Sequence, residues 1–161
     1  MESKIYVISD MHFNHQRLAD ARGFNSLKSM NACLIERWNS VVDPEDTVYH
    51  VGDFAFGENK LQWIKKLNGK IIFIRGNHDP STLTHMMQIV IRFKGKDMLL
   101  VHIPDDAKNT PFKYIIHGHI HKTGTRTYEP VPKKKYFNVC CEFHRYKPIL
   151  INQVLGELEN A

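Results

Sequence analysis

The sequence predicts an α/β protein in which strands alternate with helices along the chain. Five short runs rich in Ile, Val, Leu, Phe and Tyr have the composition of buried strands. Stretches with apolar residues at spacings of three and four, typical of amphipathic helices, lie between several of them. Each strand-like run ends in polar residues, mostly His, Asp and Asn. Because ligand sites in α/β proteins collect at the carboxyl ends of strands, we expect one functional site there.

The expected strands share a β-branched or aromatic composition and are bounded by polar residues. They span Lys4–Ile8, Asp46–Val51, Lys70–Ile74, Lys96–Val101 and Lys113–Ile116, and a further strand is expected over Tyr136–Glu142.

The expected helices follow the apolar spacing and the residues that interrupt it. Ser26–Val41 carries a regular apolar stripe, and Pro44 prevents its continuation. Glu58–Leu67 repeats this pattern, and a third helix is expected over Ser81–Gln88 after an Asp-Pro turn. Asn152 is expected to cap a short final helix.

The bulk properties are those of one globular domain spanning residues 1–161. No apolar run approaches the roughly 20 residues of a membrane span, and the N-terminus lacks a signal-peptide layout. We therefore expect a cytoplasmic protein with no membrane partner. Three cysteines, two of them adjacent, favour reduced thiols over disulfides or a zinc site. The net charge of +5 suits an anionic partner, either a phosphorylated metabolite or a nucleic acid.

The polar strand ends supply a mixed set of nitrogen and oxygen donors. Its members are Asp10, His12, Asp53, Asn77, His102, His119 and His121. Such donors suit Mn²⁺, Fe or Zn²⁺ better than Mg²⁺ alone, and Ni²⁺ is a further alternative. We expect the Asp53 carboxylate to bridge two metals through its two oxygens. A two-metal centre of this kind generates hydroxide near neutral pH and neutralises phosphate oxygens.

Glycine stands beside three of these donor groups, at Gly52, Gly76 and Gly118. Glycine adopts positive φ angles and permits close backbone approach, so we expect these positions to bring the chain near the metals.

The series of motifs resembles the calcineurin-like metallophosphoesterase superfamily. The motifs are Asp10-x-His12, Gly52-Asp53, Gly76-Asn77-His78-Asp79, His102 and Gly118-His119-x-His121, and all five sequence blocks occur in order. The short chain and its opening motif look most like the small, capless bacterial and phage phosphoesterases. The resemblance implies a four-layer α/β/β/α sandwich, in which two mixed sheets are flanked by helices.

The resemblance also implies roles for individual residues. One metal is held by Asp10, His12, Asp53 and His121, and the second by Asp53, Asn77, His102 and His119. His78 faces the substrate as the catalytic residue, and Asp79 orients it. The implied cofactors are two divalent ions, with Mn²⁺ first in order, and the implied nucleophile is a metal-bridging hydroxide.

Three residues that follow the first motif are candidates for substrate binding, namely His15, Arg17 and Arg22. Either arginine can bind phosphate bidentately, but such arginines are more often solvated or paired with carboxylates. The basic segment Lys122–Lys135 either steers an anionic substrate or polynucleotide, or carries solvated charges that protect an edge strand.

The function expected from these features is hydrolysis of a phosphodiester, or of a phosphomonoester, in a small nucleotide-like substrate. One alternative is a nuclease acting on single-stranded nucleic acid, which the basic segment would serve. Another alternative is a non-catalytic binding scaffold on the same fold. Retention of His78 and of all the metal-ligand positions argues against the scaffold.

Overall fold

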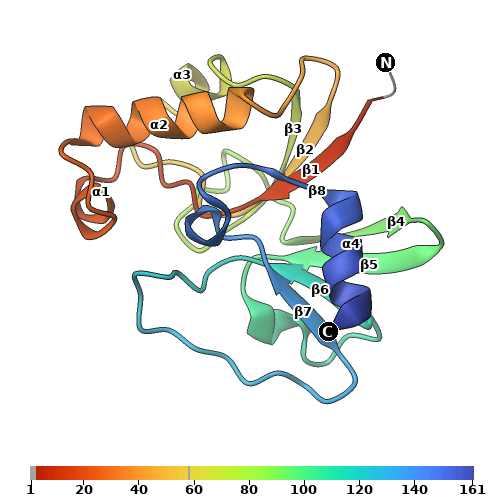
Figure 1. Cartoon of the computed structure of the whole chain (residues 1–161). Helices are drawn as coiled ribbons and strands as arrows, with labels where there is room; N and C mark the ends of the chain where they lie inside the picture. Colours follow the sequence, from red (N-terminus) through yellow and green to blue (C-terminus); the bar gives the residue numbers. More distant parts are fainter. Residues whose placement is uncertain (1–2, 58) are drawn as a thin grey trace.

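Two mixed four-stranded sheets form the framework of the protein (Figure 1). The computed structural model describes residues 3–57 and 59–161. The first sheet has the order β3-β2-β1-β8, and its strands are β1 (Ile5–Ile8), β2 (Thr47–Val51), β3 (Lys70–Ile74) and β8 (Ile149–Leu150). Strands β1, β2 and β3 run parallel, and β8 is antiparallel to β1.

The second sheet has the order β4-β5-β6-β7. Its strands are β4 (Gln88–Phe93), β5 (Lys96–Val101), β6 (Tyr114–His117) and β7 (Lys135–Asn138). Strands β4 and β5 form an antiparallel hairpin, whereas β5, β6 and β7 are parallel. The carboxyl ends of β1, β2, β5 and β6 thus carry most of the predicted metal donors.

The helices are short, and most of them lie on the outer side of the first sheet (Figure 1). They are α1 (Gln16–Ala21), α2 (Leu27–Asn39), α3 (Leu61–Ile64) and α4 (Ile151–Asn160), with 3₁₀ turns η1 (Pro104–Ala107) and η2 (Cys141–His144). None of these helices has both the length and the apolar character needed to cross a membrane.

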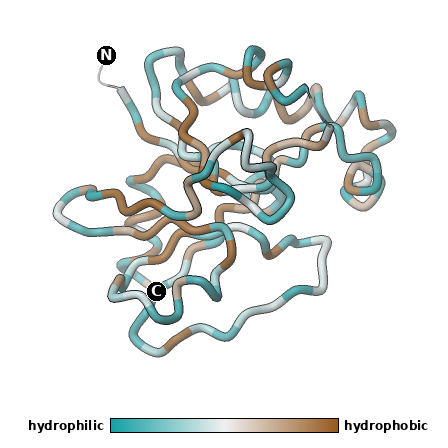
Figure 2. The backbone as a smooth tube through the Cα atoms, turned by 180° about the vertical axis from the view of Figure 1, so that it is seen from behind, coloured by the Kyte–Doolittle hydropathy of each residue, from teal (hydrophilic) through white to brown (hydrophobic). Residues whose placement is uncertain are grey.

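The core forms in layers because side chains alternate between the two faces of each strand. On β1, Tyr6 and Ile8 join the buried cluster under α2, while Val7 joins the cluster shared with the second sheet. A third cluster around Leu99 and Ile115 covers the other face of the second sheet, beneath η1 and loops. Figure 2 shows apolar residues concentrated along the strands and hydrophilic residues on the connecting loops.

The predicted fold class is confirmed, since two mixed sheets with flanking helices make up the α/β framework. The five strands expected first occur within one residue of the expected bounds. The helix expected over Ser26–Val41 is α2, and the Ser26 side chain caps it by accepting from the Ser29 N–H at 3.0 Å.

One expected helix is wrong, and one expected strand is shorter than expected. Ser81–Gln88 forms no helix; it passes through a turn into the unpredicted strand β4, and the Arg75 N–H donates to Met86 O at 2.7 Å. Contacts with the end of β3 override the local helical spacing in this segment, since the Thr84 hydroxyl also donates to Phe73 O at 3.2 Å. The strand expected over Tyr136–Glu142 ends at Asn138, where the chain turns into η2.

The other two expected helices differ from the sequence expectation in detail. Of the helix expected over Glu58–Leu67, the structure has only α3, and position 58 lies outside the described residues. Asn152 lies in the first turn of α4, whose N-cap is Leu150, and its side chain accepts from Lys94 instead.

Candidate metal centre

Left-handed backbone turns position several of the predicted metal donors. The φ angles of Asp10, His12, Asp53 and His119 are 57°, 50°, 58° and 70°, in a region that non-glycine residues seldom adopt. Such strained positions cluster at functional sites because they aim side chains in directions that regular strands do not allow. The chain therefore turns sharply after β1, β2 and β6 to present these side chains at one place.

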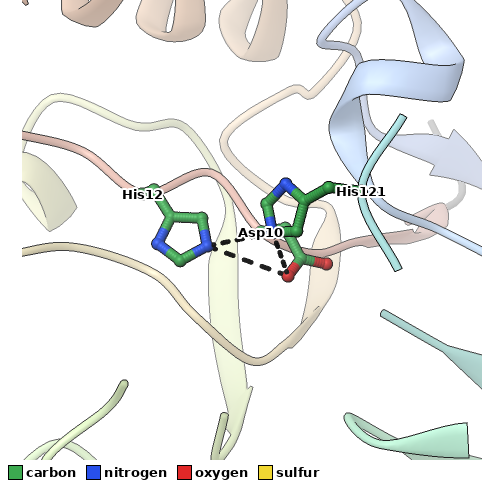
Figure 3. Close-up of side chains that lie close together, drawn as sticks. All are labelled: Asp10, His12 and His121. Carbon is green, nitrogen blue, oxygen red and sulfur yellow. Dashed lines mark hydrogen bonds and ion pairs between the residues drawn. The ribbon is translucent and has the colours of Figure 1, made fainter. Parts of the chain in front are cut away.

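A first cluster consists of Asp10, His12 and His121, whose donor atoms all lie within 4.8 Å of one another (Figure 3). His121 Nε2 lies 3.3 Å from Asp10 Oδ1 and 3.3 Å from His12 Nε2. Asp10 Oδ1 is buried and has no hydrogen-bond partner among the residues that the structure describes. A buried carboxylate oxygen without a donor, beside two imidazole nitrogens, fits a divalent cation.

A second cluster consists of Asp53, His102 and His119, again with donor atoms within 4.8 Å. Asn77 Oδ1 lies 3.0 Å from His102 Nε2 and 2.9 Å from His119 Nδ1, so the amide oxygen faces the same point. His102 Nδ1 lies 2.9 Å from Val51 O, a contact that fixes the ring and directs Nε2 into the cluster. These donors also fit a divalent cation.

The Asp53 carboxylate lies between the two clusters. Its Oδ2 atom is 3.5 Å from His12 Nε2 and 3.3 Å from His102 Nε2. The Oδ1 atom accepts the His78 N–H at 2.9 Å instead. The expectation that both oxygens would bridge is therefore corrected, because a single oxygen faces both clusters.

The charges within the site are strongly coupled. Burial opposes protonation of His102, but its hydrogen bond to Asp53 and the nearby carboxylates outweigh that effect and raise its pKa to about 9. Burial likewise opposes protonation of His121, whereas the neighbouring Asp10 and Glu142 carboxylates outweigh that effect and raise its pKa to about 10. By contrast, burial lowers the pKa of His12 to about 3. Two protonated imidazoles therefore offset the negative charge of the carboxylates. A bound cation would displace these protons.

His78 lies at the rim of the site and is solvent-exposed. Its ring centroid is 5.7 Å from that of His12 and 5.5 Å from that of Phe56. It lines an inner cavity of about 170 Å³ together with residues of both clusters. This placement leaves its imidazole available to a ligand in the cavity.

Asp79 does not have the side-chain role expected for it. Its carboxylate accepts the backbone N–H groups of Asp53 at 2.6 Å, Phe54 at 3.0 Å and Gly76 at 3.0 Å. The expectation that Asp79 orients His78 is therefore corrected: this carboxylate holds together the two backbone segments that carry Asp53 and Asn77.

The three glycines bring segments of the chain together. Only Gly52 has a positive φ, at 88°. A Cβ atom on Gly76 would collide with Asp53, and one on Gly118 would collide with Ser9 and the Asp10 carboxylate. These two glycines therefore allow chain segments that carry predicted donors to approach each other closely.

The three residues considered for substrate binding lie in different environments. The His15 ring contacts Phe56 and caps α1, with ring centroids 4.1 Å apart in the His15–Phe56 pair. Arg17 is exposed on α1 and lines an outer cavity of about 450 Å³ beside the centre. The guanidinium of Arg22 is fully buried and points into the protein, so its expected contact with substrate is wrong.

Arg22 instead forms a buried ion pair with Glu142, a residue that was not among the predicted site residues. Arg22 Nε donates to Glu142 Oε1 at 2.9 Å, and Nη2 donates to Asp10 O at 2.7 Å. The same Glu142 oxygen lies 2.7 Å from His121 Nδ1. The pair therefore supports both Asp10 and His121, although Glu142 is 120 residues from Arg22 and no local pattern marks it.

Two donor clusters that share one carboxylate, at the strand ends of a two-sheet sandwich, define a candidate dinuclear metal centre. The chain belongs to the calcineurin-like phosphoesterase superfamily, because the model of that domain matches residues 4–140. All seven predicted metal donors, from Asp10 to His121, lie inside this range.

The chain is also similar to proteins of other organisms. An uncharacterized protein of Methanocaldococcus jannaschii is 38% identical over 98% of this chain and 93% of its own length. The Gene 66 protein of Mycobacterium phage L5 is 36% identical over 48% of this chain and 40% of its own. A protein of unknown function from Aquifex aeolicus has a crystal structure that superposes with a TM-score of 0.75 at 26% identity, covering 96% and 99% of the two chains.

Proposed function

We propose that the protein is a two-metal phosphoesterase that hydrolyses phosphodiester bonds, or phosphomonoester bonds, in a nucleotide-like substrate. The observation that carries this proposal is the pair of clusters around Asp53 Oδ2, which lie beside a cavity whose rim carries His78. Two bound cations, with Mn²⁺ as the first candidate, would supply an activated water nucleophile and would neutralise phosphate oxygens.

The residues of the chain itself perform the remaining tasks. Asp10, His12 and His121 would hold one cation, and His102, His119 and Asn77 the other. Asp53 would be shared between the two. His78 is directed at the cavity and supplies a proton or a hydrogen bond to the leaving oxygen. General acid assistance of this kind contributes about 10²–10⁴ in rate.

The test is hydrolysis of bis-p-nitrophenyl phosphate and p-nitrophenyl phosphate by the protein loaded with Mn²⁺. We expect His78→Ala to lower kcat by about 10²–10⁴ while Mn²⁺ binding persists, since His78 is outside both clusters. His85→Ala, at an exposed histidine that lines none of the cavities described here, is the matched control. Full activity of His78→Ala would contradict the catalytic assignment.

A non-catalytic scaffold is the outcome if neither ester is cleaved by protein that has bound Mn²⁺. The nuclease alternative requires the basic segment to face a polynucleotide. Lys134 donates to the Thr110 and Phe112 carbonyls, and Lys135 to Glu159 O, so both ammonium groups serve the fold. Strong salt dependence of binding to single-stranded nucleic acid would nevertheless favour the nuclease.

A further inference from the structure

An outer cavity of about 450 Å³ opens beside the candidate metal centre. Arg17 and Leu18 of α1 form one wall, and Thr123 to Arg126 of the long β6–β7 loop form the other. In Figure 1, α1 and this loop lie at the same end of the molecule. His119 and His121 line both this cavity and the inner cavity of about 170 Å³, so the two cavities adjoin each other.

The charge of the outer cavity is positive. Arg17 and Arg126 both line it, and no Asp or Glu is among the described residues at its surface. Within residues 3–57 and 59–161, neither arginine has a carboxylate within ion-pair distance. By contrast, Arg22 forms an ion pair with Glu142, and Arg92 forms one with Asp97. Two unpaired guanidinium groups facing one cavity suit a phosphate, which arginine binds bidentately.

Arg126 is held at the edge of the metal centre through His119. Its Nη1 lies 2.5 Å from His119 Nε2, while His119 Nδ1 faces Asn77 and the second cluster. Arg126 lines both the inner and the outer cavity, so it lies where the two cavities meet.

We propose that the outer cavity binds a second phosphate group of the substrate, so that the enzyme prefers nucleotides carrying a terminal phosphate besides the scissile one. This inference rests on the proposed function, which places the scissile phosphate in the inner cavity. The inner cavity is small, and the rest of a nucleotide-like substrate must extend past His119 and His121 toward the two arginines.

The test compares three substrates with the same phosphodiester: adenylyl-adenosine, its 5′-phosphorylated form and its 3′-phosphorylated form. We expect the Mn²⁺-loaded protein to cleave one phosphorylated form with a kcat/KM about ten- to a hundredfold higher than the parent, as one or two charged hydrogen bonds allow. Arg126→Gln and Arg17→Gln should each reduce that ratio, chiefly through KM, and the double variant should abolish it.

Arg37→Gln, on the exposed side of α2, removes the same charge elsewhere and should keep the ratio. Equal kcat/KM values for all three substrates, or a preference that survives in the double variant, would overturn the proposal. A variant that lowers kcat equally for all three would show damage to the metal centre rather than loss of a phosphate contact.

The proposed function fails separately, if no dinucleotide and no nitrophenyl ester is cleaved. Equilibrium titration of the same three dinucleotides then still tests the cavity. Tighter binding of a phosphorylated form, lost in Arg17→Gln/Arg126→Gln but retained in Arg37→Gln, would support the second phosphate site. Equal affinities would refute it.

Discussion

Glu142 connects parts of the site that are distant in the sequence. One oxygen lies near both the Arg22 guanidinium and His121 Nδ1, and the other accepts the Thr123 N–H at 3.0 Å. Burial opposes its ionisation, but His121 and Arg22 outweigh that effect and lower its pKa to about 2. A carboxylate on the far nitrogen of a metal-binding histidine fixes the tautomer and the orientation of the ring.

We expect Glu142→Gln to weaken Mn²⁺ binding at the first cluster by about 10- to 100-fold, because His121 loses its orienting carboxylate. The variant should also lose about 3–5 kcal/mol of stability, since the buried Arg22 charge is left unpaired. Metal titration and urea unfolding measure the two effects. Glu159→Gln, which breaks the exposed pair with Lys96, is the control. Unchanged affinity in Glu142→Gln would refute the positioning role.

At the scale of elements, the ends of β1 and β6 touch through Gly118. A Cβ atom at this position would meet the side chains of Ser9 and Asp10. The His119 N–H, one residue further on, donates to Asp10 Oδ2 at 3.0 Å. The contact between the two strand ends thus depends on the absence of a side chain.

Gly118→Ala is therefore expected to destabilise the protein by about 1–3 kcal/mol through overpacking and to weaken metal binding by displacing Asp10. Gly156→Ala makes the same chemical change inside α4, where nothing lies within 4 Å of the new atom. That control should stabilise the protein by about 0.5–1 kcal/mol. Urea unfolding of both variants gives the comparison, and two shifts of the same sign would contradict this account.

At the scale of the whole molecule, each donor cluster spans both sheets. Asp10 and His12 follow β1 of the first sheet, whereas His121 follows β6 of the second. Similarly, Asp53 follows β2, while His102 and His119 follow strands of the second sheet. A cation in either cluster would therefore tie the two sheets together.

Removal of metal with EDTA should lower Tm, and Mn²⁺ should restore it, with about 2.7 kcal/mol of stabilisation at 100 times Kd. The stabilisation by Mn²⁺ should increase with pH. The raised pKa values of His102 and His121, about 9 and 10, mean that protons stabilise the metal-free fold below about pH 6.5. That stability is lost as pH rises through 9 and 10, while competition with Mn²⁺ weakens. Thermal scans at pH 6.5 and 8.5 test this, and a smaller Mn²⁺ effect at pH 8.5 would contradict it.

The amino-acid sequence was sufficient to predict the α/β class, most of the strands and the residues that form the two candidate donor clusters. Donors such as Asp10, Asp53 and His119 directly follow apolar strands, so local patterns were sufficient to find them. Strand β4 was missed although Ile89, Val90 and Ile91 are β-branched, so its residues carried a local signal for a strand.

The roles of the supporting residues depend on long-range packing that local sequence patterns do not show. Arg22 turns inward to Glu142, Asp79 holds backbone N–H groups, and Arg126 reaches the edge of the metal centre beside His119. Each of these roles depends on a partner far away along the chain or on the direction of a side chain. The local sequence sets which residues follow a strand, but packing of the two sheets sets which of them meet.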